Sequence, residues 1–226
     1  MKKVITILMV LLALGSVAFA KAGFTVSVGG SYDFVNSRII DDTTGKATDD
    51  YVRGHALGIG AGVTYNFSDH FLAYYDGSFG FILGEDINVE DVSNFSMSIS
   101  TTHHAGVAYD FNMDQLDLEV GAGVAFSYAG VVGAYKGAEY EADTATIGIS
   151  SFGAGLYGKV GYKFSDAFSV GITVHPDFMF TSADVFAASK TTKEDYATTT
   201  ESTTVSVAGA GFAFKCNAIV GVTFAF

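Results

Sequence analysis

The sequence predicts an all-β protein, an eight-stranded antiparallel β-barrel that crosses a membrane with its strands in an up-and-down meander. Three observations predict this fold. Apolar and polar residues alternate in eight segments, the connections between segments alternate between short and long, and aromatic residues gather at both ends of the apolar faces. Alternation with a period of two is typical of strands with two different environments on their two faces.

The first twenty residues predict an export signal. Two lysines precede an apolar stretch (4–14), and Ala18 and Ala20 provide the small residues of a cleavage site. The stretch is shorter than the roughly 18 apolar residues expected of a spanning helix, so a removed signal is favoured over a membrane anchor. We expect residues 1–20 to be removed and residues 21–226 to form one barrel domain.

Composition restricts the function further. The precursor is 49% hydrophobic but carries a net charge of −12, and its mean hydropathy is positive. A nucleic-acid partner is not expected, because phosphate binding needs a basic surface. The single cysteine, Cys216, provides neither a disulfide framework nor a lipoprotein anchor, and no cofactor is expected.

The first strand illustrates the alternation. From Phe24 to Phe34 the even positions are apolar residues and one glycine, whereas the odd positions are small or polar. In the second segment the opposite face is nearly all glycine. The seven further segments span residues 55–67, 71–83, 99–111, 116–128, 150–164, 168–180 and about 205–226.

The connections differ in length in a regular way. Three are tight (65–71, 109–116 and 162–168), and the other four are long and polar. Short turns at one end and long loops at the other are typical of a barrel with a periplasmic and an extracellular end. An even number of strands places both termini on the periplasmic side. The expected extracellular loops are residues 35–54, 84–98, 129–146 and 182–204.

Aromatic residues indicate that the apolar face points outward. They bracket a band of Val, Leu, Ile and Ala, as expected at the two interfaces of a bilayer. The opposite face is too small and too uncharged for the exterior of a soluble barrel. One aromatic ring comprises Tyr65, Phe67, Phe71, Tyr109, Phe111, Tyr162, Phe164, Phe168, Phe224 and Phe226, and the other Tyr32, Phe34, Phe79, Phe81, Phe126, Tyr128, Phe178 and Phe180.

One residue weakens this pattern. Pro176 removes a backbone donor from the seventh segment. We expect it near the outer rim, where a bulge or water would compensate.

The last strand carries a resemblance to a known class. Apolar residues occupy every second position from Ala218 through Val220, Val222 and Phe224 to the terminal Phe226. This pattern resembles the signal by which Gram-negative-type outer-membrane proteins enter the barrel-assembly machinery.

The whole mature chain resembles the small outer-membrane barrels of the OmpA transmembrane domain, OmpX and OmpW type. The resemblance implies a monomer in the outer membrane of a diderm bacterium, in contact with its lipid and, during biogenesis, with the assembly machinery. The chain lacks both the tryptophan usual near the end of OmpW-like barrels and the peptidoglycan-binding domain of OmpA. No function is therefore carried over.

The predicted interior is polar and leaves two alternatives open. A plugged core, in which charges pair and long side chains lie over glycines, is favoured. The other is a narrow conduit gated by an ion pair of Glu119 and Lys159, with Asp76 nearby. The inward set is Tyr74, Asp76, His104, Asp110, Asp117, Glu119, Tyr157, Lys159, Lys163, His175, Asp177, Met179, Lys215 and Asn217, against Gly58, Gly60, Gly62, Gly121, Gly123, Gly153 and Gly155.

Metal binding and catalysis are weaker alternatives. His104, His175 and Asp177 form a metal-ligand mixture near the expected outer mouth, but their spacing is not diagnostic, and polar mouth-lining residues are favoured. None of the five histidines stands in the His-x-Ser arrangement of lipid A deacylase barrels, so no catalytic residue is expected.

The outer connections are the best functional candidates, because exposed loops on a rigid scaffold commonly carry function. Their acidic residues have two interpretations. They keep the outer end solvated, or they mediate adhesion to a basic host or matrix partner. The sequence therefore predicts a structural and surface-interaction protein, with a porin-like channel as the alternative and a lipid A-modifying enzyme as a minor one. The acidic residues are Asp41, Asp42, Asp49, Asp50, Glu85, Asp86, Glu90, Asp91, Glu139, Glu141, Asp143, Glu194, Asp195 and Glu201.

Overall fold

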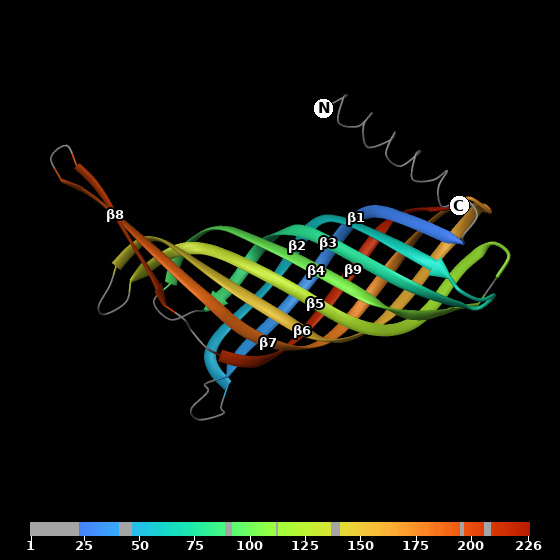
Figure 1. Ribbon diagram of the computed structural model, residues 1–226, viewed down its shortest axis with the longest axis horizontal. Helices are drawn as coiled ribbons and strands as arrows, with labels where there is room; N and C mark the ends of the chain where they lie inside the picture. Colours follow the sequence, from blue (N-terminus) through green and yellow to red (C-terminus); the bar gives the residue numbers. More distant parts are fainter. Residues whose placement is uncertain are drawn as a thin grey trace.

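The computed structural model describes residues 23–40, 47–88, 92–111, 113–136, 141–194, 197–205 and 209–226. These residues form one antiparallel sheet (Figure 1). Within the described part, no helix is long and apolar enough to cross a membrane. The strands are β1 (Phe24–Ile40), β2 (Ala47–Asn66), β3 (Phe71–Asn88), β4 (Val92–Asp110), β5 (Leu116–Lys136), β6 (Glu141–Ser165), β7 (Phe168–Glu194), β8 (Ala197–Val205) and β9 (Gly209–Ala225).

The sheet closes into a barrel of eight strands. The order is β6-β5-β4-β3-β2-β1-β9-β7, and β6 also pairs with β7. The remaining strand, β8, lies outside the barrel wall, and among the described residues it pairs with the outer part of β7, from Phe186 opposite Val205 to Glu194 opposite Ala197. The predicted eight-stranded closed barrel is confirmed, and the expected eighth strand (about 205–226) corresponds to β9.

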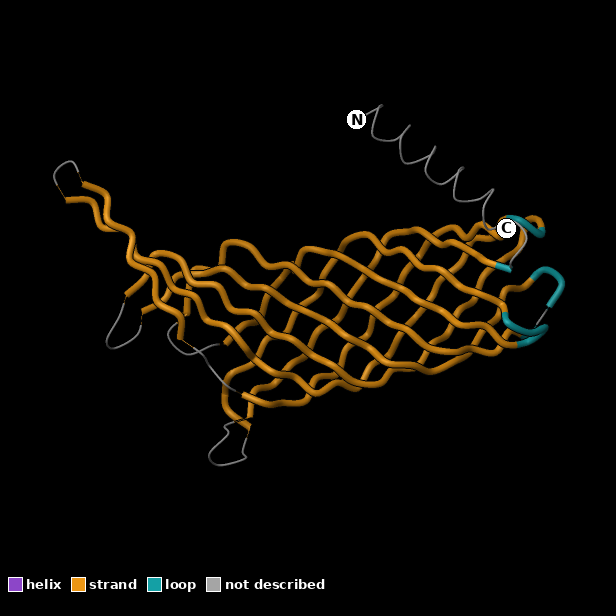
Figure 2. The backbone as a smooth tube through the Cα atoms, viewed as in Figure 1, coloured by secondary structure: helices purple, strands orange, loops and turns teal. Residues whose placement is uncertain are grey.

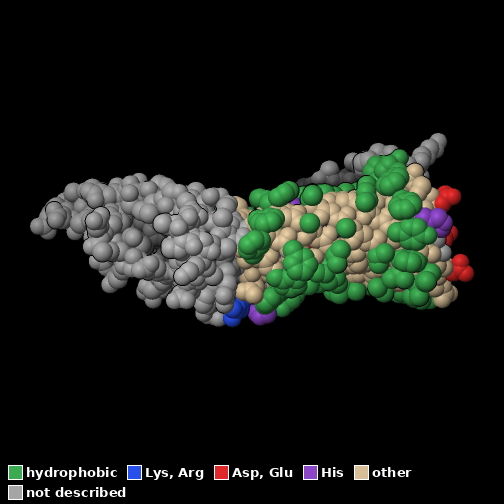
Figure 3. All heavy atoms as spheres, turned by 90° about the horizontal axis from the view of Figure 1, so that it is seen from below, with side chains coloured by type: hydrophobic (Ala, Val, Ile, Leu, Met, Phe, Trp, Pro, Cys, Tyr) green, Lys and Arg blue, Asp and Glu red, His purple; other side chains and the backbone are tan. Residues whose placement is uncertain are grey.

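The alternation has the predicted direction. On the face shown in Figure 3, apolar side chains are spread over the exterior and gather toward both ends of the described barrel. Val124, for example, is 52% exposed. The other face is buried and polar, with twenty-one buried polar or charged residues among those described. An apolar exterior around a polar interior is the reverse of a soluble protein and suits a lipid surrounding.

The three tight turns lie where the sequence places them. β2 ends at Asn66 and β3 begins at Phe71, and the β4–β5 and β6–β7 connections are similarly short. In the first turn the backbone N–H of Phe71 donates to the Ser68 hydroxyl at 2.9 Å. This local bond of a serine to a backbone group close in sequence is a common way to hold a tight turn.

The four outer connections contain more strand than expected. β1 continues to Ile40, β3 to Asn88, β5 to Lys136 and β7 to Glu194, so much of each predicted loop is paired sheet that projects beyond the barrel (Figure 2). The sequence did not reveal these extensions, because a strand outside the membrane meets water on both faces and needs no alternation.

Pro176 interrupts the ladder without the expected bulge. Its neighbour on β9 is Cys216. On the β6 side, pairing stops after Asp177 opposite Gly155 and resumes in the same register at Val174 opposite Gly158. The missing proline N–H therefore costs local pairing while the register of β7 is preserved.

Candidate functional site

The polar side chains inside the barrel form the candidate site, and they fall into three clusters. The cluster nearest the short turns, called here the lysine cluster, contains Asp117, Glu119, Tyr157, Lys159 and Ser169. Lys159 Nζ lies 2.8 Å from Asp117 Oδ2 and 3.0 Å from Glu119 Oε1. The Tyr157 hydroxyl donates to Glu119 at 2.5 Å, and the Ser169 hydroxyl donates to Asp117 at 3.1 Å. One ammonium group thus bridges two buried carboxylates.

The structure brings together two of the three residues predicted as a gate. Glu119 and Lys159 are direct cross-strand neighbours on β5 and β6. Asp76 lies elsewhere and contacts His175 instead. Asp117 was predicted to point inward but not to share the lysine. The signal was available, because Asp117 and Glu119 are two positions apart on one strand face.

A cavity of about 210 Å³ lies at the short-turn end of the barrel and reaches the lysine cluster. Asp110 and Lys163, both half-buried, join its wall, as predicted for inward positions near the rim. Its charged lining residues are Asp110, Asp117, Glu119, Lys159, Lys163 and Asp166. The cavity provides water access from the short-turn end to the ion pair.

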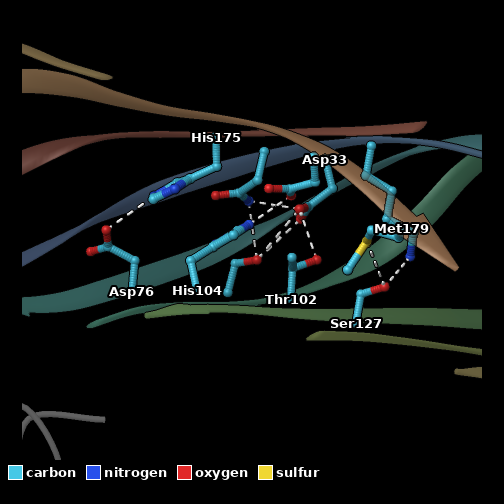
Figure 4. A network of polar contacts seen from close by, with 11 residues as sticks. Asp33, Asp76, Thr102, His104, Ser127, His175 and Met179 are labelled. Carbon is cyan, nitrogen blue, oxygen red and sulfur yellow. Dashed lines mark hydrogen bonds and ion pairs between the residues drawn. The ribbon is translucent and has the colours of Figure 1, made fainter. Parts of the chain in front are cut away.

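Two histidine–aspartate pairs form the second cluster, the histidine cluster, shown in Figure 4. His104 Nε2 lies 2.7 Å from Asp177 Oδ2, and His175 Nε2 lies 3.0 Å from Asp76 Oδ2. The two imidazoles are stacked with centroids 3.9 Å apart and an interplanar angle of 5°. Tyr74 completes the layer, because its ring lies 5.8 Å from that of His175.

The position of these histidines corrects the sequence-based expectation. His104, His175 and Asp177 were expected to line the outer mouth, whereas they are buried inside the barrel, with His175 and Asp177 at 0% exposure. Each imidazole binds a carboxylate through Nε2. Among the described residues, no group of three or more His, Cys, Asp or Glu side chains is arranged so that it could hold a metal ion.

The third cluster, the Asp33 cluster, lies on β1, β3, β4 and β9. Asp33 accepts hydrogen bonds from Ser78 (3.3 Å), Thr102 (3.2 Å) and Asn217 Nδ2 (2.6 Å). Asp33 was absent from the predicted interior set, although it occupies the polar face of the first alternating segment. Lys215 on β9 is buried as well, and its ammonium donates to Ser127.

Glycines make room for the buried carboxylates. A Cβ on Gly62 would overlap Asp76 Oδ1, and a Cβ on Gly155 would overlap Asp177 Oδ1. The glycine-rich inner face predicted from the sequence therefore has a specific purpose at these two positions. It lets a carboxylate of one strand lie against the backbone of the next.

Aromatic stacking fills the space between the clusters. The rings of Tyr74 and Tyr157 are stacked with centroids 4.2 Å apart, and Tyr157 lies edge-on to His175 at 5.3 Å. Tyr157 also binds Glu119, so it connects the lysine cluster to the histidine cluster. These rings cross the interior above the cavity.

Two further predicted features are the assembly signal at the C-terminus and the cleavage site of the export signal. Most of the predicted assembly signal lies on β9, where Val220 is 58% and Phe224 36% exposed. Phe226 follows the strand, and its backbone N–H donates to Phe24 O at 3.0 Å. The cleavage residues Ala18 and Ala20 lie outside the described residues, and so do the side chains of the acidic outer residues.

Comparisons with known proteins establish the fold. No protein-family model matches the sequence, and no curated protein matches it either. The outer membrane protein OprG from Pseudomonas aeruginosa superposes with a TM-score of 0.54 at 10% identity, over 91% of this chain and 96% of OprG. The chain has the fold of small outer-membrane β-barrels. The predicted resemblance to that class is confirmed at the level of the fold.

Two further solved structures are similar over most of the chain. AlkL gives a TM-score of 0.49 at 13% identity, covering 91% of this chain and 90% of AlkL. Ail of Yersinia pestis, an attachment invasion locus protein, gives 0.42 at 10% identity, covering 90% of this chain and 99% of Ail.

Proposed function

We propose that the protein is a non-enzymatic scaffold of the outer membrane that displays a surface-interaction region outside the cell on a plugged barrel. The observation that carries the proposal is the extension of the strands beyond the apolar band. At about 3.3 Å per residue, the part of β7 from Phe180 to Glu194 is roughly 45 Å long. It pairs with β8 along its outer part.

The filled interior supports a scaffold. Ion pairs at 2.7 to 3.0 Å and stacked rings occupy the middle of the barrel, so a solute would have to break buried ion pairs to pass. Breaking a buried pair costs about 3–5 kcal/mol. A rigid barrel of this kind is a suitable support for an exposed, variable recognition surface.

The chemistry of the partner follows from the sequence of the outer segments. They contain more acidic than basic residues, which gives the outer end a negative field. We therefore propose a basic surface, on a host cell or an extracellular matrix, as the partner.

The test uses cells that display the protein and surfaces coated with polylysine or with an uncharged polymer. We expect adhesion to polylysine that is lost when residues 187–204 are replaced by a short turn. Heat-modifiable gel mobility must show that this variant still forms the barrel. A variant that keeps the segment but carries Asn or Gln at Glu194, Asp195 and Glu201 should lose much of the adhesion. Equal adhesion of all three proteins would refute the proposal.

A narrow channel is the second candidate, and the cavity at the short-turn end favours it, because water reaches Lys159 and Glu119 there. In this case the lysine cluster is the gate. Planar-bilayer recordings decide between the candidates. Conductance steps that change in Lys159→Met would support a channel, whereas folded protein without conductance would support the plugged scaffold.

A further inference from the structure

Strand β8 forms an open edge of the sheet outside the barrel. It is the last strand in the order of the sheet and lies next to β7. β7 pairs with β6 as far as Ser189, and beyond that point its residues Lys190–Glu194 pair with β8. Within the described part of the chain, no strand lies on the other side of β8. Alternate backbone N–H and C=O groups along Ala197–Val205 therefore have no strand partner there.

The sequence of β8 lacks the features that usually protect an open strand edge. Natural edges are commonly blocked by lysine, proline, a bulge or a very short strand. β8 is nine residues long and keeps one register with β7 throughout. Five threonines and Val205 are β-branched, Glu201 is the one charged residue, and the strand contains neither lysine nor proline. A strand with this composition readily accepts another strand at its edge.

A second copy of the same strand fits this edge. Two identical strands pair antiparallel about a two-fold axis, so each hydrogen bond is made twice. Threonines on neighbouring strands stabilise each other through cross-strand hydrogen bonds. Charge permits the approach as well, because residues 186–205 contain two lysines and three acidic residues, a net charge of −1, whereas the whole chain carries −12.

The direction of β8 decides how two copies must meet. The β7–β8 hairpin projects farther from the barrel than the other described strands (Figure 2). β8 runs from Ala197, opposite Glu194, back to Val205, opposite Phe186, and so toward its own membrane. Two upright copies in one membrane hold their β8 strands in the same direction. Copies in two facing membranes hold them in opposite directions, as antiparallel pairing requires.

We propose that β8 pairs antiparallel with β8 of a second copy in a facing membrane, so that the protein joins two cells that both carry it. The partner is the chain itself and not a basic surface, so this adhesion is separate from the function proposed above. The contact is made by backbone groups along the whole strand, as when an extended peptide adds to the edge of a sheet.

The experiment uses phospholipid nanodiscs that each hold one folded barrel, which makes pairing within one membrane impossible. We expect sedimentation to show pairs of discs, and electron microscopy to show them face to face. The double variant Thr198→Lys with Thr200→Lys should associate at least about tenfold more weakly, because lysines block strand edges. Heat-modifiable gel mobility verifies that the barrel is folded.

The matched control places the same two charges on β6, in Thr144→Lys with Thr146→Lys. Thr146 lies between Val132 of β5 and Ala187 of β7, so it is not at an edge. This control should pair like the original protein. The comparison separates the edge from charge, because added lysines reduce the negative charge of the chain and would strengthen pairing if repulsion alone controlled it.

A competing peptide tests the unchanged protein. A synthetic peptide with the sequence of residues 197–205 should separate the paired discs, whereas the same peptide with N-methyl groups on alternate residues should not, because it cannot complete the hydrogen bonds.

Three results would overturn the proposal. One is single discs at a protein concentration of about 100 μM; if these discs bound the peptide, the edge would instead accept a strand of another protein. Another is equal pairing in the β8 lysine variant and the β6 control. The third is discs joined side by side.

Discussion

Replacement of Lys159 by methionine tests how the interior is held together. Lys159 lies between Asp117 and Glu119, at 2.8 and 3.0 Å, and all three side chains are buried. At an effective dielectric of about 20, each contact is worth roughly 5–6 kcal/mol of Coulomb energy before the desolvation of the ammonium is subtracted. Loss of one partner of a buried pair costs about 3–5 kcal/mol net. We expect Lys159→Met to destabilise the barrel by that amount.

The assay is urea unfolding of the protein in lipid vesicles, followed by heat-modifiable gel mobility. Lys163→Met is the control, because Lys163 is half-buried near the rim, where its ammonium donates to Met113 O at 3.4 Å. It should change the free energy of unfolding by less than about 1 kcal/mol.

A triple variant separates charge from packing. Lys159→Met combined with Asp117→Asn and Glu119→Gln removes all three charges and keeps similar volumes. We expect it to recover much of the lost stability, as in other buried ion pairs replaced by neutral groups. A loss below about 1 kcal/mol in Lys159→Met, or no recovery in the triple variant, would show that the ion pairs do not stabilise this interior.

Three further predictions address the interior, the orientation of the faces and assembly. Gly155→Ala places a methyl group against the Asp177 carboxylate and should cost about 1–3 kcal/mol in the same unfolding assay, and a neutral result would mean that the neighbouring side chain shifts freely. A spin label at Val124 should be accessible to oxygen dissolved in lipid, whereas one at Gly123 should not. The reverse accessibility would show that the lipid-facing and inner faces have been assigned the wrong way round. Deletion of Phe226 should lower the yield of assembled barrel in cells while the purified protein still folds in detergent, and an unchanged cellular yield would remove the assembly role of this residue.

The sequence predicted those features of the fold that a lipid surrounding requires of each spanning strand. Lipid surrounds the barrel, so each spanning strand must alternate between a lipid face and an inner face, and Val124 and Gly123 could be assigned to opposite faces from their positions alone. The same rule located Glu119 and Lys159 inside, and their pairing was predicted because their strands are neighbours and the two residues lie at similar heights above the short turns. The extensions beyond the apolar band follow no such rule, so β8 was not predicted.

The internal contacts were predicted less well than the internal residues. Asp76 was grouped with the Glu119–Lys159 pair from its inward phase, yet it binds His175, which is ninety-nine positions away in sequence. The alternation along one strand shows which face of the sheet a residue lies on, but it does not show which residue that side chain contacts across the barrel. The partner depends on the tilt and stagger with which the sheet closes, and these are properties of the whole barrel.

The interior polar network also has a consequence for how the strands find their register. On the lipid side, Val, Leu and Phe gain similar burial in any register that keeps the faces, so the exterior discriminates little between registers that differ by two residues. Inside, a shift by two would move Asp177 off Gly155 and His104 off Asp177. An unpaired charge in the barrel would then cost several kcal/mol. The buried pairs therefore specify one register among those that the membrane accepts, and this is the physical reason for ionic groups in an interior that apolar side chains could also fill.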